Sequence, residues 1–386
     1  MDHQEEGEEN VSASLIPHMA DEITLNILHR LPVRSQIRFQ IVSRTWQDLI
    51  SNPTRPDSCY SVSNIFKTPI LTGFLVDDLP YAIHYLPITI DPQVNAHVKS
   101  ANFKSFEFLP RNFDDEYRIL ASSNGSLLFS RTTVSDPQET TYVVCNPFTG
   151  QAIVLPFTDC HTQPRVCFDT ELDHSRTKFH FSVVLLYIGG MDGVKIKMFT
   201  SKGINRVTYH EFPSLYHKRL ISSCRKPVGA INGIFYWLSY PLIVTIDLNK
   251  STVETAYLPS WNNNDEHCLC ISEGRIYYVN KFNNILQLWV SQAFPGKDSF
   301  CWESLYTTDT SEHGFSVFKF IGFHPRDPMT VVFTVNGSTG SKICKLFNFQ
   351  QNSIQLPHTS PTEFSLNASL EFFPCEWFPW PLPLHS

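Results

Sequence analysis

The sequence lacks the features of a membrane-spanning or exported chain. No apolar run approaches the roughly 18 to 20 residues that a membrane-spanning helix needs, and one of the longest is Val183 to Ile188. The first nine residues carry five acids and no Lys or Arg, whereas an export signal starts with positive charge and an apolar stretch. We therefore expect no membrane partner, a cytoplasmic or nuclear location, and ten cysteines that stay reduced.

Basic charge is also scarce. The chain has 30 Lys and Arg against 37 Asp and Glu, which gives a formal net charge of -7. Five of these acids lie in the first nine residues, so the remainder is close to neutral. Proteins that track nucleic-acid phosphates concentrate positive charge on one surface, so we expect no nucleic-acid partner. Residues 1–14 are expected to be a disordered acidic tail.

Signatures of catalysis and of metal binding are missing as well. No Gly-x-Ser-x-Gly motif is present. The segment from Gly337 to Lys342 differs from a phosphate-binding loop, because Ile343 follows the Lys where Ser or Thr is required. The Cys and His residues between positions 160 and 180 match no zinc spacing. We expect a non-catalytic protein with no metal and no cofactor.

Residues 15–55 are predicted to form a small all-α unit of three helices. Asp21 and Glu22 suit the first turn of a helix, Pro32 ends that helix, and Asn52-Pro53 ends the third. Trp46 is expected to anchor the unit's own core. So small a unit leaves apolar side chains that a partner would cover.

Residues 56–375 are predicted to be all-β. Short segments rich in Val, Ile, Phe, Tyr and Thr alternate with Gly, Asn and Pro turns. Asn124-Gly125, Asn232-Gly233 and Asn336-Gly337 predict two-residue hairpins, because type I′ turns require positive φ angles.

A weak repeat runs through this region, in which one strand leads through a polar turn to a second strand ending in an apolar-Pro pair. The prolines of the four pairs lie 57, 46 and 98 residues apart, and Leu286 to Trp302 supplies a hairpin inside the long interval. A period of roughly 50 residues predicts four-stranded propeller blades, about six in number. The alternative is an irregular pair of β-sandwiches. The four pairs are Leu155-Pro156, Phe212-Pro213, Leu258-Pro259 and Leu356-Pro357.

Residues 19–50, MADEITLNILHRLPVRSQIRFQIVSRTWQDLI, resemble the F-box of plant F-box proteins. The opening Leu-Pro of the pattern is replaced by Met19-Ala20, and the usual Leu after Ser35 is Gln36. Both departures fall near the positions where the family contacts its adaptor. The matching positions are Glu22, Ile23, Ile27, Leu28, Arg30, Leu31, Pro32, Val33, Ser35, Arg38, Phe39, Val42, Ser43, Trp46, Leu49 and Ile50.

The β region is similar to the F-box-associated, propeller-like interaction domain of the same proteins. Residues 118–125 followed by Val144-Cys145-Asn146-Pro147 are similar to its opening motif, and residues 232–237 followed by Ile246-Asp247-Leu248 to its central one. Residues 376–386 form a separate tail rich in Pro and aromatic residues.

The resemblance implies a substrate-recognition subunit of an SCF-type cullin-RING ubiquitin ligase. The F-box would bind a Skp-family adaptor and, through it, the cullin-RING scaffold, while the β domain would recruit an unknown target protein for ubiquitination. The surest contact is Leu31-Pro32-Val33, as an exposed apolar step between two helices. The residues expected to bind the adaptor are Ile16, Pro17, Met19, Ile23, Leu31, Pro32, Val33 and Ile37.

The alternative is an adaptor-independent propeller that binds a protein or a glycan. Trp237, Trp261 or Trp289 would then serve as an aromatic platform for a sugar, although Trp at such positions more often packs inside a blade. Target contacts are expected on loops, which carry no periodic signal. Candidate loops are residues 111–116, 216–219 and 261–264.

Overall fold

The computed structural model describes helical residues near the N-terminus and the strands that follow. No helix among these residues is long and apolar enough to cross a membrane. The described residues are 23–24, 27–28, 39, 42, 44–51, 70–78, 82–87, 106–110, 115–133, 135–160, 164–172, 179–188, 194–202, 206–212, 226–231, 233–260, 266–272, 274–291, 301–311, 318–324, 327–336, 342–355 and 371–377.

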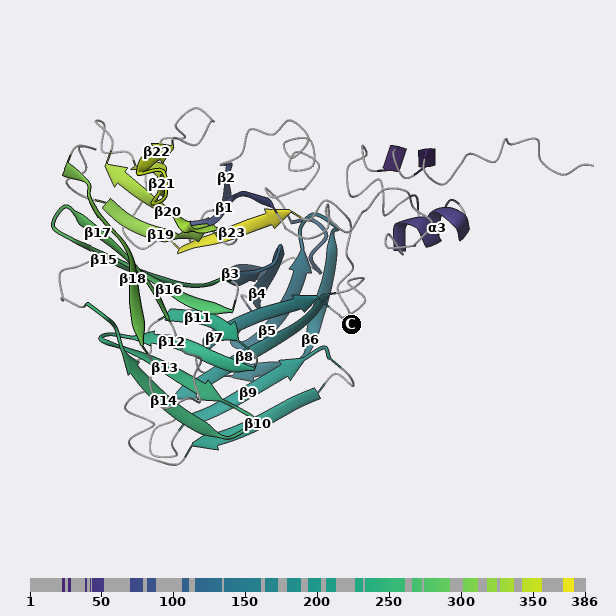
Figure 1. Cartoon of the computed structure of the whole chain (residues 1–386). Helices are drawn as coiled ribbons and strands as arrows, with labels where there is room; N and C mark the ends of the chain where they lie inside the picture. Colours follow the sequence, from purple (N-terminus) through teal and green to yellow (C-terminus); the bar gives the residue numbers. More distant parts are fainter. Residues whose placement is uncertain are drawn as a thin grey trace, which may run out of the picture.

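Strands β3 to β22 form five four-stranded antiparallel sheets, each built from four strands that are consecutive in the chain (Figure 1). The strands are β3 (Asp115–Ser123), β4 (Ser126–Thr133), β5 (Asp136–Asn146) and β6 (Gln151–Cys160); β7 (Arg165–Leu172), β8 (Phe179–Ile188), β9 (Val194–Thr200) and β10 (Arg206–Phe212); β11 (Lys226–Ile231), β12 (Ile234–Ser239), β13 (Leu242–Asp247) and β14 (Thr252–Tyr257); β15 (Glu266–Ser272), β16 (Arg275–Phe282), β17 (Ile285–Ser291) and β18 (Trp302–Asp309); β19 (Phe318–His324), β20 (Asp327–Asn336), β21 (Lys342–Asn348) and β22 (Ser353–Gln355).

A sixth sheet joins the two ends of the β region. It contains β1 (Ile70–Asp78), β2 (Ala82–Pro87) and β23 (Glu371–Trp377), in the order β2-β1-β23. Pro374 lies in β23, and it is tolerated there because β23 is the edge strand of its sheet.

The six sheets form a closed ring. The first strand of each four-stranded sheet contacts the first strand of the next, in the order β3, β7, β11, β15 and β19, and β23 contacts both β19 and β3. Each sheet is therefore one blade, and the described strands form a six-bladed β-propeller. This agrees with the predicted number of blades. The structure describes only parts of residues 15–55, so the prediction of three helices there is not tested beyond α3 (Arg44–Ser51).

Turn chemistry explains the repeat. Its four copies are the third and fourth strands of four blades, and the hairpin found between Leu286 and Trp302 is the same pair in a fifth. At the end of a third strand, Asn146 Oδ1 accepts hydrogen bonds from the backbone N–H groups of Phe148 (2.9 Å) and Thr149 (3.2 Å). Asp247 Oδ1 accepts two such bonds from Asn249 and Lys250. The Asn or Asp in the repeat is thus the residue that closes the turn.

The predicted hairpins are present. Asn124 and Gly125 join β3 to β4 with φ angles of 44° and 76°, as a type I′ turn requires. Gly233 has φ 79° between β11 and β12, and Asn232 lies outside the described residues. Asn336 pairs with Lys342 across β20 and β21, so a hairpin is present there, but five residues separate the paired positions, and the prediction of a two-residue turn is wrong at this hairpin.

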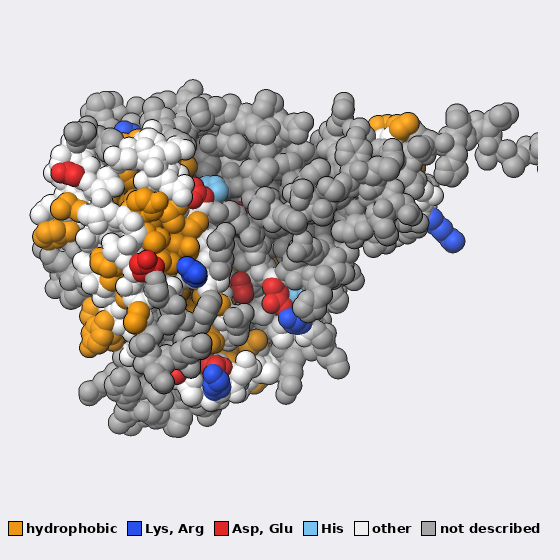
Figure 2. All heavy atoms as spheres, viewed as in Figure 1, with side chains coloured by type: hydrophobic (Ala, Val, Ile, Leu, Met, Phe, Trp, Pro, Cys, Tyr) orange, Lys and Arg blue, Asp and Glu red, His pale blue; other side chains and the backbone are white. Residues whose placement is uncertain are grey.

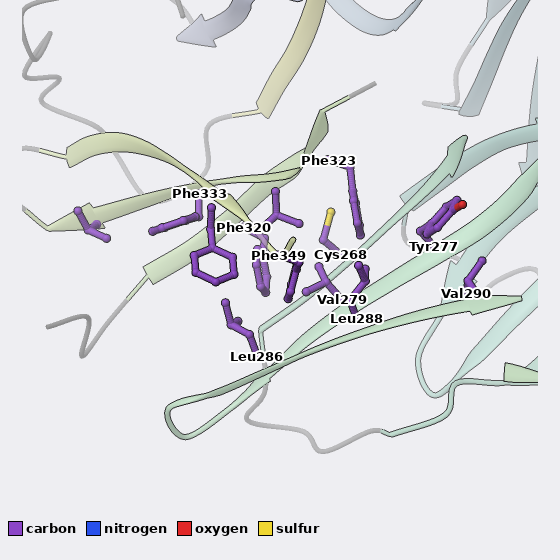
Figure 3. Packing of buried hydrophobic residues seen from close by; sticks show 13 residues of the cluster. Cys268, Tyr277, Val279, Leu286, Leu288, Val290, Phe320, Phe323, Phe333 and Phe349 are labelled. Atoms are coloured by element: carbon purple, nitrogen blue, oxygen red, sulfur yellow. The ribbon is translucent and has the colours of Figure 1, made fainter. Parts of the chain in front are cut away.

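The core lies between adjacent blades. Figure 3 shows the cluster between the β15–β18 and β19–β22 blades, where Leu286 and Leu288 of one blade meet Phe320 and Phe333 of the other. In the β11–β14 blade Trp237 is completely buried in a similar cluster. Trp237 therefore belongs to the blade core and offers no platform to a sugar.

A buried ion pair joins the first two four-stranded blades. Lys197 Nζ on β9 lies 2.6 Å from Asp159 Oδ1 on β6, with both side chains close to fully buried. The Tyr187 hydroxyl also donates to Asp159, and the Lys197 ammonium lies 4.8 Å from the centre of the Phe157 ring. Each charge thus has partners on the neighbouring blade.

We expect Asp159→Asn to lower the free energy of unfolding by about 3 kcal/mol, because it leaves the Lys197 ammonium buried without its counter-charge. Lys197→Met should cost a similar amount, and the double variant should cost less than the sum of the two. Denaturant unfolding of the wild type, the two single variants and the double variant measures the coupling energy between Asp159 and Lys197. Additive losses would contradict direct pairing.

The closing sheet generates a second stability prediction. Deleting residues 371–386 removes β23, which leaves β1 unpaired on one side and breaks the ring between β19 and β3. We expect loss of the cooperative thermal transition and binding of a hydrophobic dye. Deleting residues 378–386 alone is the control and should preserve the transition. A cooperative transition in the longer deletion would show that closure is dispensable.

Candidate functional site

The first helical residues have one buried side and one exposed side. Thr24 and Leu28 are buried, with 3% and 0% of their surface exposed. Ile23 and Ile27 are 53% and 42% exposed. Residues four apart lie on one face of a helix, so the buried pair defines an inner face and the isoleucine pair an outer face.

The second group of helical residues repeats this division. Leu49 of α3 is buried, and the rings of Phe39 and Trp46 pack with centroids 5.1 Å apart. Trp46 is partly buried and packs against the cluster that contains Leu28 and Leu49, as expected for a core anchor. Val42, in contrast, is 58% exposed.

Ile23, Ile27 and Val42 therefore make up an exposed apolar set on the helical segment, which we name the helical apolar face. Figure 2 shows hydrophobic side chains uncovered on this part of the molecule. Water contact with three large aliphatic side chains is unfavourable, and burial of these side chains against a partner would remove that cost.

Of the residues predicted to bind the adaptor, the structure describes Ile23, whose side chain is exposed. Sequence reasoning did not select Ile27 and Val42 for the surface. The sequence feature that could have identified Ile27 is its four-residue spacing from Ile23. This spacing places both isoleucines on one face of the helix, which differs from the face of Thr24 and Leu28. The predicted residues outside the described part of the chain are Ile16, Pro17, Met19, Leu31, Pro32, Val33 and Ile37.

The described residues contain no group of three or more His, Cys, Asp or Glu side chains that could hold a metal ion. Burial raises the pKa of the Cys167 thiol and that of Cys270, which keeps both protonated at neutral pH. Cys167 is buried in the core, and Cys270 is partly buried and packs against the cluster between the β15–β18 and β19–β22 blades.

Comparison with known proteins identifies the helical segment. A family model described as the F-box domain matches residues 16–57. The chain contains an F-box domain. Its exposed Ile23, Ile27 and Val42 all lie inside the matched range.

Relatives of this chain include F-box proteins of Arabidopsis thaliana. F-box protein At5g07610 is 24% identical over 324 residues, which cover 77% of this chain and 72% of the relative. F-box protein At5g49610 is 27% identical over 264 residues, which cover 65% of this chain and 66% of the relative. The similarity extends beyond the F-box into the propeller, and the all-β region is consistent with an F-box-associated domain.

A solved structure similar to this chain is the β-propeller domain of the Trilobed protease from Pyrococcus furiosus. It is 8% identical, with a TM-score of 0.35, over 63% of this chain and 71% of that one. At this TM-score the likeness carries no conclusion, and the propeller arrangement rests on the strand pairing alone.

The two faces of the F-box helix predict effects of very different size when an aliphatic residue is replaced by Ser. Leu28→Ser replaces a buried aliphatic side chain with a smaller one that carries a hydroxyl group. We expect this change to lower the free energy of unfolding of the F-box by about 3 kcal/mol. Ile27→Ser should change it by less than about 0.5 kcal/mol. Hydrogen exchange of the F-box amides measures both, and equal effects would contradict the assignment of the two faces.

Proposed function

We propose that this protein is the substrate-recognition subunit of an SCF-type cullin-RING ubiquitin ligase. Its F-box binds a Skp-family adaptor, and its propeller recruits a target protein for ubiquitination. The observation that carries the proposal is an F-box with an exposed apolar face in the same chain as a ring of β blades.

The helical apolar face suits an adaptor made of helices. Helices with uncovered apolar side chains dock into grooves on partner proteins, with contacts from positions i and i+4. Ile23 and Ile27 have this spacing, and both expose a large part of their side chains. Burial of such side chains stabilises a complex by roughly 25 cal/mol for each Å² of apolar surface removed from water.

The subunit makes and breaks no bonds in this proposal. It holds a target beside the ubiquitin-loaded enzyme that the rest of the complex carries, which raises the effective concentration of the target's lysines. A closed propeller suits this task, because six packed blades keep the target site at a fixed position.

Binding of the full chain to a purified plant Skp-family adaptor tests the proposal. We expect Ile23→Ser with Ile27→Ser to weaken binding by about 10- to 100-fold, because two apolar contacts are removed. Leu31→Asp with Pro32→Ala should abolish binding, and both variants should retain the circular dichroism of the β domain. Calorimetry or surface plasmon resonance measures the affinities.

Val154→Ser is the matched control, because Val154 is 45% exposed on β6, outside the F-box. It should bind the adaptor like the wild type. If the wild-type chain binds none of a panel of Skp-family adaptors, the ligase function is wrong, and the adaptor-independent propeller becomes the function to test.

A further inference from the structure

Chain connectivity separates the propeller into two ends. The ends of β3 and β7 lie together, because Ser123 Oγ is 3.0 Å from Thr170 Oγ1 and Asn124 donates to the Thr170 carbonyl oxygen. We call the first strand of each four-stranded blade, together with β23, an inner strand, because these strands contact one another around the ring. Adjacent inner strands thus run in the same direction. The segment that follows the F-box enters β1 at Ile70, which pairs with Trp377 at the end of the inner strand β23.

The F-box therefore joins the propeller at the end where the inner strands finish. We name the opposite end, where the inner strands begin, the distal end. The turns from second to third strand lie there, as do the connections between blades. Of the candidate loops, residues 115–116 begin the inner strand β3 at this end, and residues 111–114, 216–219 and 261–264 lie outside the described part of the chain.

One hairpin at the distal end exposes an apolar pair. Phe282 ends β16 and Ile285 begins β17, and the two residues pair directly across the strands. Their side chains are 45% and 39% exposed. The pair sits on a two-residue turn that is held in place, since the N–H and hydroxyl of Thr310 both donate to the Asn284 carbonyl oxygen at 2.7 Å.

The charge beside this pair is negative. Asp309 of β18 pairs with Ile285, so it lies on the same face of the sheet. It is exposed, and hydrogen bonds from Ser311 lower the pKa of its carboxyl group, so it is ionised at neutral pH. Lys281 points to the opposite face of β16 and pairs with Glu266, whose carboxylate attracts it.

We propose that the hairpin tip formed by Phe282, Ile285 and Asp309 docks a target segment in which a large apolar residue adjoins a Lys or Arg. The apolar residue packs on Phe282 and Ile285. The cation faces Asp309. This inference rests on the proposed function, because it names the chemistry of the target that the propeller recruits.

A library of random 12-residue peptides, displayed on phage and selected on the full chain bound to its adaptor, tests the proposal. We expect the enriched peptides to combine an aromatic or aliphatic residue with Lys or Arg. Synthetic copies should bind Phe282→Ser with Ile285→Ser at least about tenfold more weakly than wild type, by fluorescence anisotropy. Asp309→Asn should weaken binding about threefold and reduce its dependence on salt.

Val154→Ser with Tyr257→Ser is the control, because it removes two exposed apolar side chains from other blades. It should bind the peptides like wild type. Absence of enrichment, enrichment of acidic peptides, or equal weakening in the control would each overturn the proposal. So would a hairpin variant that changes only self-association of the chain, which would make a second copy the occupant.

Adaptor affinity, measured on the same samples, separates this inference from the proposed function. The hairpin variants should bind the adaptor like wild type. If the wild type binds no adaptor, selection on the chain alone still tests the hairpin, and only the ligase function fails.

Discussion

The pairing of β1 with β23 is the interaction on which the rest of the structure depends. It joins Ile70 to Trp377 and Asp77 to Glu371, residues that lie about 300 positions apart in the chain. Because β23 also contacts β19 and β3, this one ladder gives the first and last four-stranded blades a neighbour on their open sides. Adjacent blades then bury apolar side chains against each other, as Leu286, Phe320 and Phe333 do at one seam. An open ring would leave two apolar faces in water.

The sequence was informative where structure is local. Asn146 and Asp247 close turns with bonds to backbone groups two or three residues away, so a repeat in turn chemistry was enough to place third and fourth strands. The closing strand gave no such signal. The predicted β region ends at residue 375 and the predicted tail begins at 376, whereas β23 runs to Trp377 and pairs with β1 at the other end of the chain. Pairing over that separation depends on the completed ring, which no local pattern encodes.

The same limit applies to the surfaces. Isoleucine and leucine are used both inside the F-box and on its outside, so composition does not distinguish Leu28 from Ile27. Only their phase on the helix does, and that phase needs one buried residue as a reference. Phe282 and Ile285 are harder to predict, because such residues in a strand usually belong to the core. Their exposure follows from their position at the tip of a hairpin. The neighbouring cross-strand pair, Lys281 and Leu286, is the last one before the tip that contains a buried side chain, that of Leu286.

Ring closure also bears on how a receptor of the proposed kind would work. The F-box segment enters through β1, a strand of the closing blade, and the Phe282–Ile285 hairpin stands on another blade at the other end of the strands. A chain of flexible domains would spread a bound target over many positions, which lowers its effective concentration at any one point. Seams such as that of Asp159 and Lys197 oppose relative movement of blades, since separating them exposes a buried charge. Rigidity between the two ends therefore comes from the same packing that makes the fold stable.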